Sequence, residues 1–427
     1  MSQQPNEFKQ LSVAEWKLKV QAELAGLDYN EVLVWDTAEG LQVKPVYTQE
    51  DRNSEASQPI QTTKDWKIIG QFLNDAKQDH SYLYGFEVPD EFASKVSGLP
   101  NYLDLFFRCE NPKELLKSVD FASLPNLKYL GLDVIGNFAA TGNWMDSQEE
   151  DFEFAKKVQE TNLFEKSLEI NASLYQNAGA NHVQQIAMAV SHGVEYLEKL
   201  GPEAASKIYF KTAVGGNYFF EIAKLRALRK LWKLVLAEYK QEAEPFILAE
   251  TSLRNKSLLD IHNNLIRSGL EASAAIQGKA DVVHVLPYDS VKSTNPFSEE
   301  LASKQQLLLQ KESFFDRFED PVAGSYFVEN ITELFVKTAL DLFQKIEKDG
   351  GFLKGLLDGS VQKMIQKAAE KEQQAFDEGK LILIGVNKFR NTADKVEKSE
   401  RKLNPVRTLI QPIFPKRLAE KIENSID

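Results

Sequence analysis

Lys207-Ile-Tyr-Phe-Lys-Thr-Ala-Val214, followed by Gly215-Gly216 and a long segment from Asn217 to Trp232, is the stretch that decides the fold. Its first part is rich in β-branched and aromatic side chains, which favour a short strand, and the two glycines mark a turn. After Asn217 the apolar residues recur at steps of three and four, as on a helix with one buried face. A strand, a glycine turn and a one-sided helix together indicate a parallel sheet covered by helices.

The same alternation continues along much of the chain. Eight β-rich runs occur at 82–88, 102–109, 129–135, 168–172, 207–212, 246–250, 281–286 and 381–386. Helical patterns lie among them at 91–98, 112–119, 149–163, 180–199, 217–240, 256–277, 298–313, 331–348 and 357–377. Eight parallel units close into a (β/α)₈ TIM barrel, so an α/β barrel is the predicted fold. An open doubly wound sheet is the alternative, but no Gly-x-Gly-x-x-Gly follows the first strand.

Residues 1–60 do not follow this alternation. A short helix is predicted after Ser12, and residues 32–47 read as a hairpin about Glu39-Gly40. An arm of this size is too small to bury the rings of Trp16, Trp35 and Tyr47 by itself. We expect it to lie either against another chain or against the body of its own chain. The predicted organisation is an arm (1–60), a barrel (61–390) and a C-terminal tail (391–427) with a last short helix near 418–422.

Composition excludes several classes of protein. The 51 Lys and Arg residues against 63 Asp and Glu residues give a net charge of −12, which disfavours nucleic acid and anionic membranes as partners. The single cysteine, Cys109, excludes an internal disulfide. There is no apolar run of about 18 residues and the N-terminus is polar, so neither a membrane span nor a secretory signal is expected, and a cytoplasmic protein is predicted.

Four stretches carry a resemblance to a known family. The run Asn217-Tyr-Phe-Phe-Glu-Ile-Ala-Lys-Leu-Arg-Ala-Leu-Arg-Lys-Leu-Trp232 resembles the barrel of adenosylcobalamin-dependent methylmalonyl-CoA mutases almost without a break. So do the stretch from Asp320 to Thr332, in which Asn330 and Glu333 read as a helix-capping box, and the run at 381–388. The Trp35-x-Thr-x-Glu-Gly pattern of the arm resembles the start of that family's small subunits. The resemblance covers about residues 12–390.

The resemblance implies where a catalytic site would lie, and this chain departs from it there. In active members, acyl-CoA threads down the barrel axis and a histidine polarises the thioester carbonyl. That histidine aligns with Leu174, and a second family histidine and a glutamine align with Leu248 and Glu250. A family arginine and serine align with Lys207 and Tyr209, and residues 51–66 lack the family's substrate segment. We therefore expect no catalytic residue in this chain.

The resemblance also bears on the cofactor. The family's corrin-binding module is a separate α/β domain, and the roughly forty residues after Val386 are fewer than such a domain needs. The motif that supplies the cobalt ligand is Asp-x-His-x-x-Gly, and Asp260-Ile-His262 lacks its glycine. The five histidines show no metal-site spacing. The expectation is that this chain binds neither adenosylcobalamin nor a metal, and that the cofactor belongs to a partner.

The sequence thus leads to a main hypothesis and two alternatives. The main hypothesis is a non-catalytic small subunit that packs against, and stabilises, the large catalytic subunit of a heterodimeric mutase. The first alternative is a barrel that binds or transforms acyl-CoA in its own right, using Lys207, Glu250, Asn263 and Asn264. The second is a free homodimer that acts as a regulator.

Overall fold

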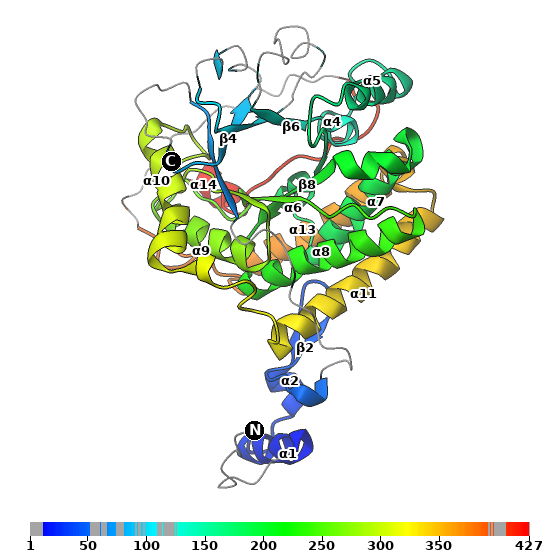
Figure 1. Cartoon of the computed structure of the whole chain (residues 1–427). Helices are drawn as coiled ribbons and strands as arrows, with labels where there is room; N and C mark the ends of the chain where they lie inside the picture. Colours follow the sequence, from blue (N-terminus) through cyan, green and yellow to red (C-terminus); the bar gives the residue numbers. More distant parts are fainter. Residues whose placement is uncertain are drawn as a thin grey trace, which may run out of the picture.

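A closed parallel barrel forms the centre of the molecule (Figure 1). The computed structural model describes residues 12–51, 60, 66–73, 81–89, 92, 95–96, 99–108, 113, 124, 126–391, 393, 396 and 407–426. The barrel strands are β3 (Lys67–Gln71), β4 (Gly85–Pro89), β5 (Asp104–Arg108), β6 (Leu127–Gly131), β7 (Leu168–Asn171), β8 (Ile208–Val214), β9 (Ile247–Thr251) and β10 (Val282–His284). They are hydrogen-bonded in the order β6-β5-β4-β3-β10-β9-β8-β7. A parallel bridge between Tyr129 and Lys166 joins the two remaining edges, so the predicted (β/α)₈ barrel is confirmed.

Two of the strand predictions need correction. The first barrel strand, β3, was not among the predicted runs, and the predicted run at 381–386 is not a barrel strand. The end of this run enters a turn, in which Ile384 bridges to Lys388 and Gly385 has a φ of +81°. Short apolar runs do not reveal whether they lie in a strand or in a buried loop, because they show neither helical nor strand periodicity.

Helices cover the outside of the barrel. They are α4 (Val134–Thr141), α5 (Gln148–Glu160), α6 (Ser173–Asn177), α7 (His182–Leu200), α8 (Tyr218–Glu238), α9 (Asn263–Gln277), α10 (Pro296–Leu307), α11 (Tyr326–Lys348), α12 (Phe352–Asp358), α13 (Ser360–Asp377) and α14 (Glu420–Asn424). The helices expected at 91–98 and 112–119 fall almost wholly outside the described residues. Among the described residues, no helix combines the length and the apolar composition that a membrane crossing requires.

The unit formed by β8 and α8 packs as its sequence predicts. Trp232 of α8 is 1% exposed, and its ring meets Phe210 of β8 edge to face at 5.2 Å. On the neighbouring helix α7, a Cβ at Gly193 would lie 2.7 Å from the same indole ring. A glycine at this position therefore lets α7 approach Trp232 closely, and the two helices cover one side of the barrel together.

Helix α11 begins earlier than its predicted start at 331. Ser325 caps it by accepting a hydrogen bond from the Val328 backbone N–H, and the helix runs from Tyr326. Asn330 is consequently inside the helix, where its side chain donates to the Tyr326 carbonyl at 2.7 Å. The predicted capping box between Asn330 and Glu333 is therefore wrong, because a serine five residues upstream supplies the cap.

The N-terminal arm consists of α1 (Val13–Glu23), α2 (Tyr29–Leu33) and the hairpin strands β1 (Trp35–Asp36) and β2 (Gln42–Val43). Ser12 caps α1 in a capping box with Glu15, as expected for the predicted helix start. The hairpin about Glu39-Gly40 is also present, although residues 32 and 33 belong to α2 rather than to the hairpin. In Figure 1 the hairpin lies beside α11, whereas α1 extends away from the barrel.

Candidate functional site

Aromatic and aliphatic side chains fill the N-terminal half of the barrel interior. Inward-facing residues from six strands form one cluster in which every side chain is at most 3% exposed: Ile69, Phe106, Tyr129, Tyr209, Leu248 and Val282. The Phe106 and Tyr129 rings are parallel with centroids 3.9 Å apart, and Phe246 stacks on the other side of Tyr129 at 5.4 Å. Stacked rings therefore occupy the axis of the barrel, along which the family's acyl-CoA would be expected to pass.

Ionisable side chains fill the layer above, toward the C-terminal ends of the strands. Lys211 of β8 donates a hydrogen bond to Glu87 of β4, and its Nζ lies 3.2 Å from a carboxylate oxygen of Glu250 on β9. His284 of β10 completes the group, with its Nδ1 3.6 Å from Glu87 Oε2. Because β4 is four strands away from β8 in the barrel, the Lys211 contact with Glu87 joins opposite sides of the wall across the interior.

The pKa values of this group follow from burial and from close opposite charges. Burial disfavours the charged form of Lys211, but the carboxylates of Glu250 and Glu87 more than offset this and raise its pKa. Burial likewise opposes ionisation of Glu87, yet the Lys211 ammonium holds its pKa at about 2. Burial lowers the pKa of His284, so its imidazole is neutral near pH 7. The result is one buried ammonium shared by two carboxylates.

Two further carboxyl groups at this end of the barrel have raised pKa values. Burial raises the pKa of Glu169 on β7 to about 7, and its Oε2 accepts a hydrogen bond of 2.6 Å from Tyr209. Gly131 gives this pair its space, because a Cβ there would lie 3.0 Å from Glu169 Oε2. Burial raises the pKa of Glu299, at the start of α10, to about 8. Carboxyl groups with separated pKa values are common at functional sites, although buried ion networks produce them as well.

Three residues of this group have the side chains of a possible metal site. Glu87, Glu250 and His284 each offer one ligand atom, and these atoms lie within 4.8 Å of one another. However, Lys211 Nζ already contacts both carboxylates. A metal ion between them would have to displace a buried ammonium whose pKa those same carboxylates raise. The residues therefore fit an internal cation better than they fit a metal ion.

The positions that the sequence comparison singled out lie in different parts of this site. Leu248 is in the aromatic layer and Glu250 in the ionic layer. Leu174 is on α6, just beyond the end of β7, and belongs to the large core between sheet and helices. Each leucine is buried. The prediction that these positions supply no catalytic group stays a prediction.

The four residues proposed for an independent enzyme do not come together. Lys207 lies at the opposite end of the barrel from Glu250, where its Nζ donates to the Phe164 carbonyl at 2.8 Å. The Asn264 amide donates to the backbone carbonyls of Ser257 and Tyr288, and Asn263 donates to Asp260 at the start of α9. Only Glu250 of this set lies in the barrel interior. His262 is exposed at the N-terminus of α9.

Sequence reasoning missed Glu87, Lys211 and His284. A signal was present, since each is a charged or titratable residue inside a short run of apolar residues: Gly-Phe-Glu87-Val, Tyr-Phe-Lys211-Thr and Val-Val-His284-Val. Such a residue on a buried strand needs a partner. The order of the strands in the barrel determines which residue is that partner. The residues brought together here are up to about 200 positions apart in the sequence, so a local sequence pattern does not reveal the pairing.

The three aromatic residues of the arm have different surroundings. Trp35 stacks on Phe220 of α8 with ring centroids 5.2 Å apart, and Tyr47 meets Phe327 of α11 at 5.6 Å. The hairpin therefore follows the second expectation and packs on its own body. Trp16, by contrast, meets another ring of the arm itself, that of Tyr29, at 6.3 Å. None of the residues of α1, all of which are described, is buried.

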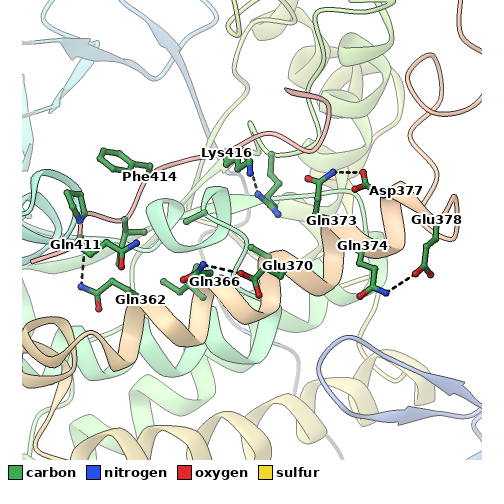
Figure 2. A pocket seen from close by; sticks show the side chains of 16 residues that line it. Gln362, Gln366, Glu370, Gln373, Gln374, Asp377, Glu378, Gln411, Phe414 and Lys416 are labelled. Atoms are coloured by element: carbon green, nitrogen blue, oxygen red, sulfur yellow. Dashed lines mark hydrogen bonds between the residues drawn. The ribbon is translucent and has the colours of Figure 1, made fainter. Parts of the chain in front are cut away.

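A groove of about 700 Å³ lies outside the barrel, between α13 and residues 411–416 of the tail. Figure 2 shows that glutamine side chains from one face of α13 line it. Gln366 donates to Glu370 and Gln373 to Asp377, each at 3.0 Å, while Gln362 donates to the Gln411 carbonyl of the tail at 3.1 Å. These amides already have partners within the protein, so the groove holds the tail against α13 rather than presenting free donors to a ligand.

Known proteins are similar to this chain in sequence. A family model described as methylmalonyl-CoA mutase matches residues 129–411. The methylmalonyl-CoA mutase small subunit of Porphyromonas gingivalis is 28% identical over a 485-residue alignment that covers 98% of this chain and 77% of that protein. The large subunit of Propionibacterium freudenreichii subsp. shermanii is 35% identical over 235 residues, which is 52% of this chain and 32% of that protein. The Escherichia coli mutase is 34% identical over 226 residues, which is 50% of this chain and 31% of that protein.

The extent of these matches differs between the two kinds of relative. The chain spans about three quarters of the small subunit but only about a third of the large subunit and of the Escherichia coli enzyme. The family model covers well over half of this chain and includes five of the eight barrel strands, β6 to β10. The chain therefore belongs to the methylmalonyl-CoA mutase family.

Proposed function

We propose that this chain is the non-catalytic small subunit of a heterodimeric methylmalonyl-CoA mutase, and that it stabilises a larger chain that carries adenosylcobalamin and isomerises methylmalonyl-CoA and succinyl-CoA. The observation that carries the proposal is the filling of the barrel axis by the protein's own side chains. The Phe106, Tyr129 and Phe246 rings stack in its N-terminal half, and Lys211 bridges two carboxylates above them. A substrate on the axis would have to displace both layers.

The energetic argument supports the same proposal. Moving the Phe106 and Tyr129 rings aside would expose side chains that are now almost fully buried, at roughly 1.5–3 kcal/mol for each large apolar group. Separating Lys211 from its partners would leave uncompensated charges in a dry interior, which costs about 3–5 kcal/mol when one partner of a buried pair is lost. Leu174 stands where active family members have a histidine. The thioester carbonyl of a substrate would therefore find no hydrogen-bond donor at this position.

The arm supports a partner of this kind. The described helices α1 and α2 and the short segment between them extend from the body and leave large apolar side chains exposed, among them Leu18, Leu27 and Val32. Exposed apolar side chains on a projecting element favour burial against another chain. An obligate interface of this type buries more than about 2,000 Å² in total. The similarity to a small subunit makes a large mutase subunit the partner that we propose.

Native mass spectrometry of the untagged complex tests the proposal directly. We expect the 48.4 kDa chain in a one-to-one assembly with a larger mutase chain, and we expect the corrin absorption to follow the larger chain when the two are separated. Recovery of the chain only as a homodimer would favour the regulator alternative. A corrin band that stays with the isolated chain through gel filtration would overturn the proposal.

The second candidate, an acyl-CoA-binding barrel or enzyme, has no comparable support. Its proposed residues are dispersed, as Lys207 faces the N-terminal end of the barrel and Asn264 is tied to backbone carbonyls. Titration of the isolated chain with short-chain acyl-CoA by calorimetry separates the two functions. We expect no heat of binding beyond dilution.

A further inference from the structure

The turn of the N-terminal hairpin inserts a carboxylate into the body of the protein. The Glu39 side chain is only 4% exposed, and its Oε1 lies 2.6 Å from Nδ1 of His182 at the start of α7. The neighbouring residue, Asn181, donates from its side chain to the Ala38 carbonyl at 3.3 Å. The hairpin tip is thus held by contacts to both its backbone and its side chain.

The contact does not end at His182. The other ring nitrogen, Nε2, lies 3.4 Å from Glu221 Oε1 on α8, and Glu221 Oε2 lies 2.5 Å from the Lys224 ammonium. Lys224 also donates to Gln185 Oε1 at 2.9 Å and to the Ala213 carbonyl of β8 at 2.6 Å. Charges alternate in sign along Glu39, His182, Glu221 and Lys224, which we name the arm clasp.

The arm clasp reaches the barrel wall. Glu221 Oε1 accepts a hydrogen bond of 2.8 Å from the backbone N–H of Gly215, directly after β8. Together with the hydrogen bond from Lys224 to the Ala213 carbonyl, this contact joins the arm clasp to the C-terminal end of β8. A single chain of contacts therefore connects the tip of the arm hairpin with the strand that carries Lys211.

Aromatic rings enclose the arm clasp. The His182 imidazole is nearly parallel to the Phe335 ring of α11 at 5.8 Å and meets the Phe220 ring edge-on at 5.6 Å. Phe220 is also the ring on which Trp35 of the hairpin stacks. The ionic contact thus holds the turn of the hairpin, and the aromatic contact holds its first strand, β1. Enclosure also strengthens each charge pair, because water is excluded from it.

The hairpin needs such an anchor. Its two strands pair through only two residue positions, Trp35 with Val43 and Asp36 with Gln42. An isolated two-stranded ribbon is marginal in water even when it is longer than this. Helices α1 and α2 precede the hairpin directly, so their direction relative to the barrel depends on how firmly the hairpin is docked.

We propose that Glu39, His182, Glu221 and Lys224 form a positioning device that fixes the direction of the arm before the larger chain binds. The inference rests on the proposed function in one respect, namely that the arm contacts a large mutase subunit. Fixing the arm in advance raises affinity, because less conformational freedom is lost on association. Glu39 and His182 are positioning residues, since they act through the arm rather than by touching the partner.

The first experiment uses the isolated full-length chain and needs no partner. Hydrogen exchange is measured at the Thr37 amide, which donates to the Leu41 carbonyl, and at the Gly40 amide, which donates to the Thr37 carbonyl. In Glu39→Gln, which keeps the shape of the side chain but removes its charge, we expect these amides to exchange at least about tenfold faster while barrel amides keep their protection. The control variant Glu149→Gln removes a charge of the same sign from an exposed position of α5, which lies far from the arm in Figure 1. In this control the hairpin amides and the barrel amides should exchange as in the unaltered chain.

A second variant guards against a trivial result. His182→Gln removes the central cation and is expected to accelerate the same amides, whereas Glu39→Gln changes only the arm side and leaves the body intact. Unchanged exchange at Thr37 and Gly40 in Glu39→Gln overturns the positioning device. Loss of protection throughout the barrel in Glu39→Gln would also overturn it, because the clasp would then support the whole fold and not the arm.

The second experiment measures binding of the same variants to the larger chain. We expect Glu39→Gln to weaken the complex about tenfold. The reason is that fewer chains hold the arm in the direction that binding requires, so association is slower. Glu149→Gln should bind as the unaltered chain does. Faster exchange with unaltered affinity would show that the arm clasp holds the hairpin but does not serve the partner, which overturns the inference. If the unaltered chain forms no complex, the proposed function fails, and the exchange experiment still decides whether the clasp anchors the hairpin.

Discussion

Lys211 determines what the interior of this barrel can hold. Its ammonium is the cation in contact with both Glu87 and Glu250, and its side chain is almost fully buried. A buried charge of this kind is tolerated only while its partners are present, since desolvation is costly for each ion alone. The Lys211 ammonium thus occupies the space between the two carboxylates.

Lys211→Met is expected to destabilise the chain by about 3–5 kcal/mol, because two buried carboxylates lose their counter-ion. Urea unfolding followed by tryptophan fluorescence measures the change. The triple variant Lys211→Met, Glu87→Gln and Glu250→Gln removes all three charges and should recover most of the loss. A single variant that unfolds at the same urea concentration as the unaltered chain would show that the ammonium is not the counter-ion of these carboxylates.

The site could be predicted from sequence only in part, and the reason lies at the level of residues. Leu174, Leu248 and Glu250 were found because a family motif marks their positions in the chain. Glu87, Lys211 and His284 belong to no such motif. Which residues their side chains contact depends on the order and register of the barrel strands. A charged residue on a buried strand signals a partner but does not identify it.

Helix α7 illustrates how an element is placed by one small residue. At Gly193 a Cβ would approach the Trp232 ring to 2.7 Å and Ile170 Cδ1 to 3.0 Å. Both neighbours belong to the core that fixes α7 and α8 on the barrel, and neither is the flexible end of a polar side chain. The close approach of the helix therefore requires glycine.

Gly193→Ala is expected to lower the free energy of unfolding by about 1–3 kcal/mol, as overpacking of a well-packed core does. Gly269→Ala is the matched control, because Gly269 also lies inside a helix and its added Cβ would meet only the end of the Gln305 side chain, at 3.2 Å. There the gain in helix propensity, about 0.5–1 kcal/mol, should balance the small shift of Gln305. Equal stability of the two variants would contradict the packing argument. Chemical denaturation of both proteins provides the comparison.

The elements of the fold were predictable to different degrees. Helix α8 and strand β8 show long, regular patterns, and the structure places them within a few residues of the prediction. Strand β3 was missed because Lys67-Ile-Ile-Gly-Gln71 has only two strongly β-forming residues. The run at 381–386 has four apolar residues in succession, yet it turns at Gly385. The predicted number of barrel strands, eight, was right, although the run at 381–386 was counted in place of β3.

At the scale of the whole molecule, several of the described groups bind protons more tightly in the folded chain than in the unfolded one, and Glu169, Glu299 and His182 are three of them. Burial raises the pKa of Glu169 to about 7 and that of Glu299 to about 8. Burial lowers the pKa of His182, but the carboxylates of Glu221 and Glu39 outweigh this and raise it to about 9. All three pKa values lie above the ordinary values for their side chains, so all three link folding to proton uptake in the same direction.

The sign of the effect follows for each group. Between about pH 4.5 and pH 8 the folded state keeps protons on Glu169 and Glu299 that the unfolded state releases, so stability falls as the pH rises through that window. The contribution of protonated His182 is complete below about pH 6.5 and is lost as the pH rises through 9. On the acid side, Glu87 and Glu221 have pKa values of about 2, so their contribution is lost as the pH falls below about 4.5.

We therefore expect maximal stability at about pH 5 and a decline as the pH rises above it. Urea unfolding at several pH values measures the curve. In the double variant Glu169→Gln and Glu299→Gln the decline between about pH 5 and pH 8 should flatten, while His182→Gln should remove the part of the decline that lies nearest pH 9. Because His182 belongs to the arm clasp, its part of the decline should be accompanied by faster exchange of the hairpin amides, whereas the part due to the two carboxyl groups should not. A decline between about pH 5 and pH 8 that is as steep in the double variant as in the unaltered chain would contradict the assignment to Glu169 and Glu299.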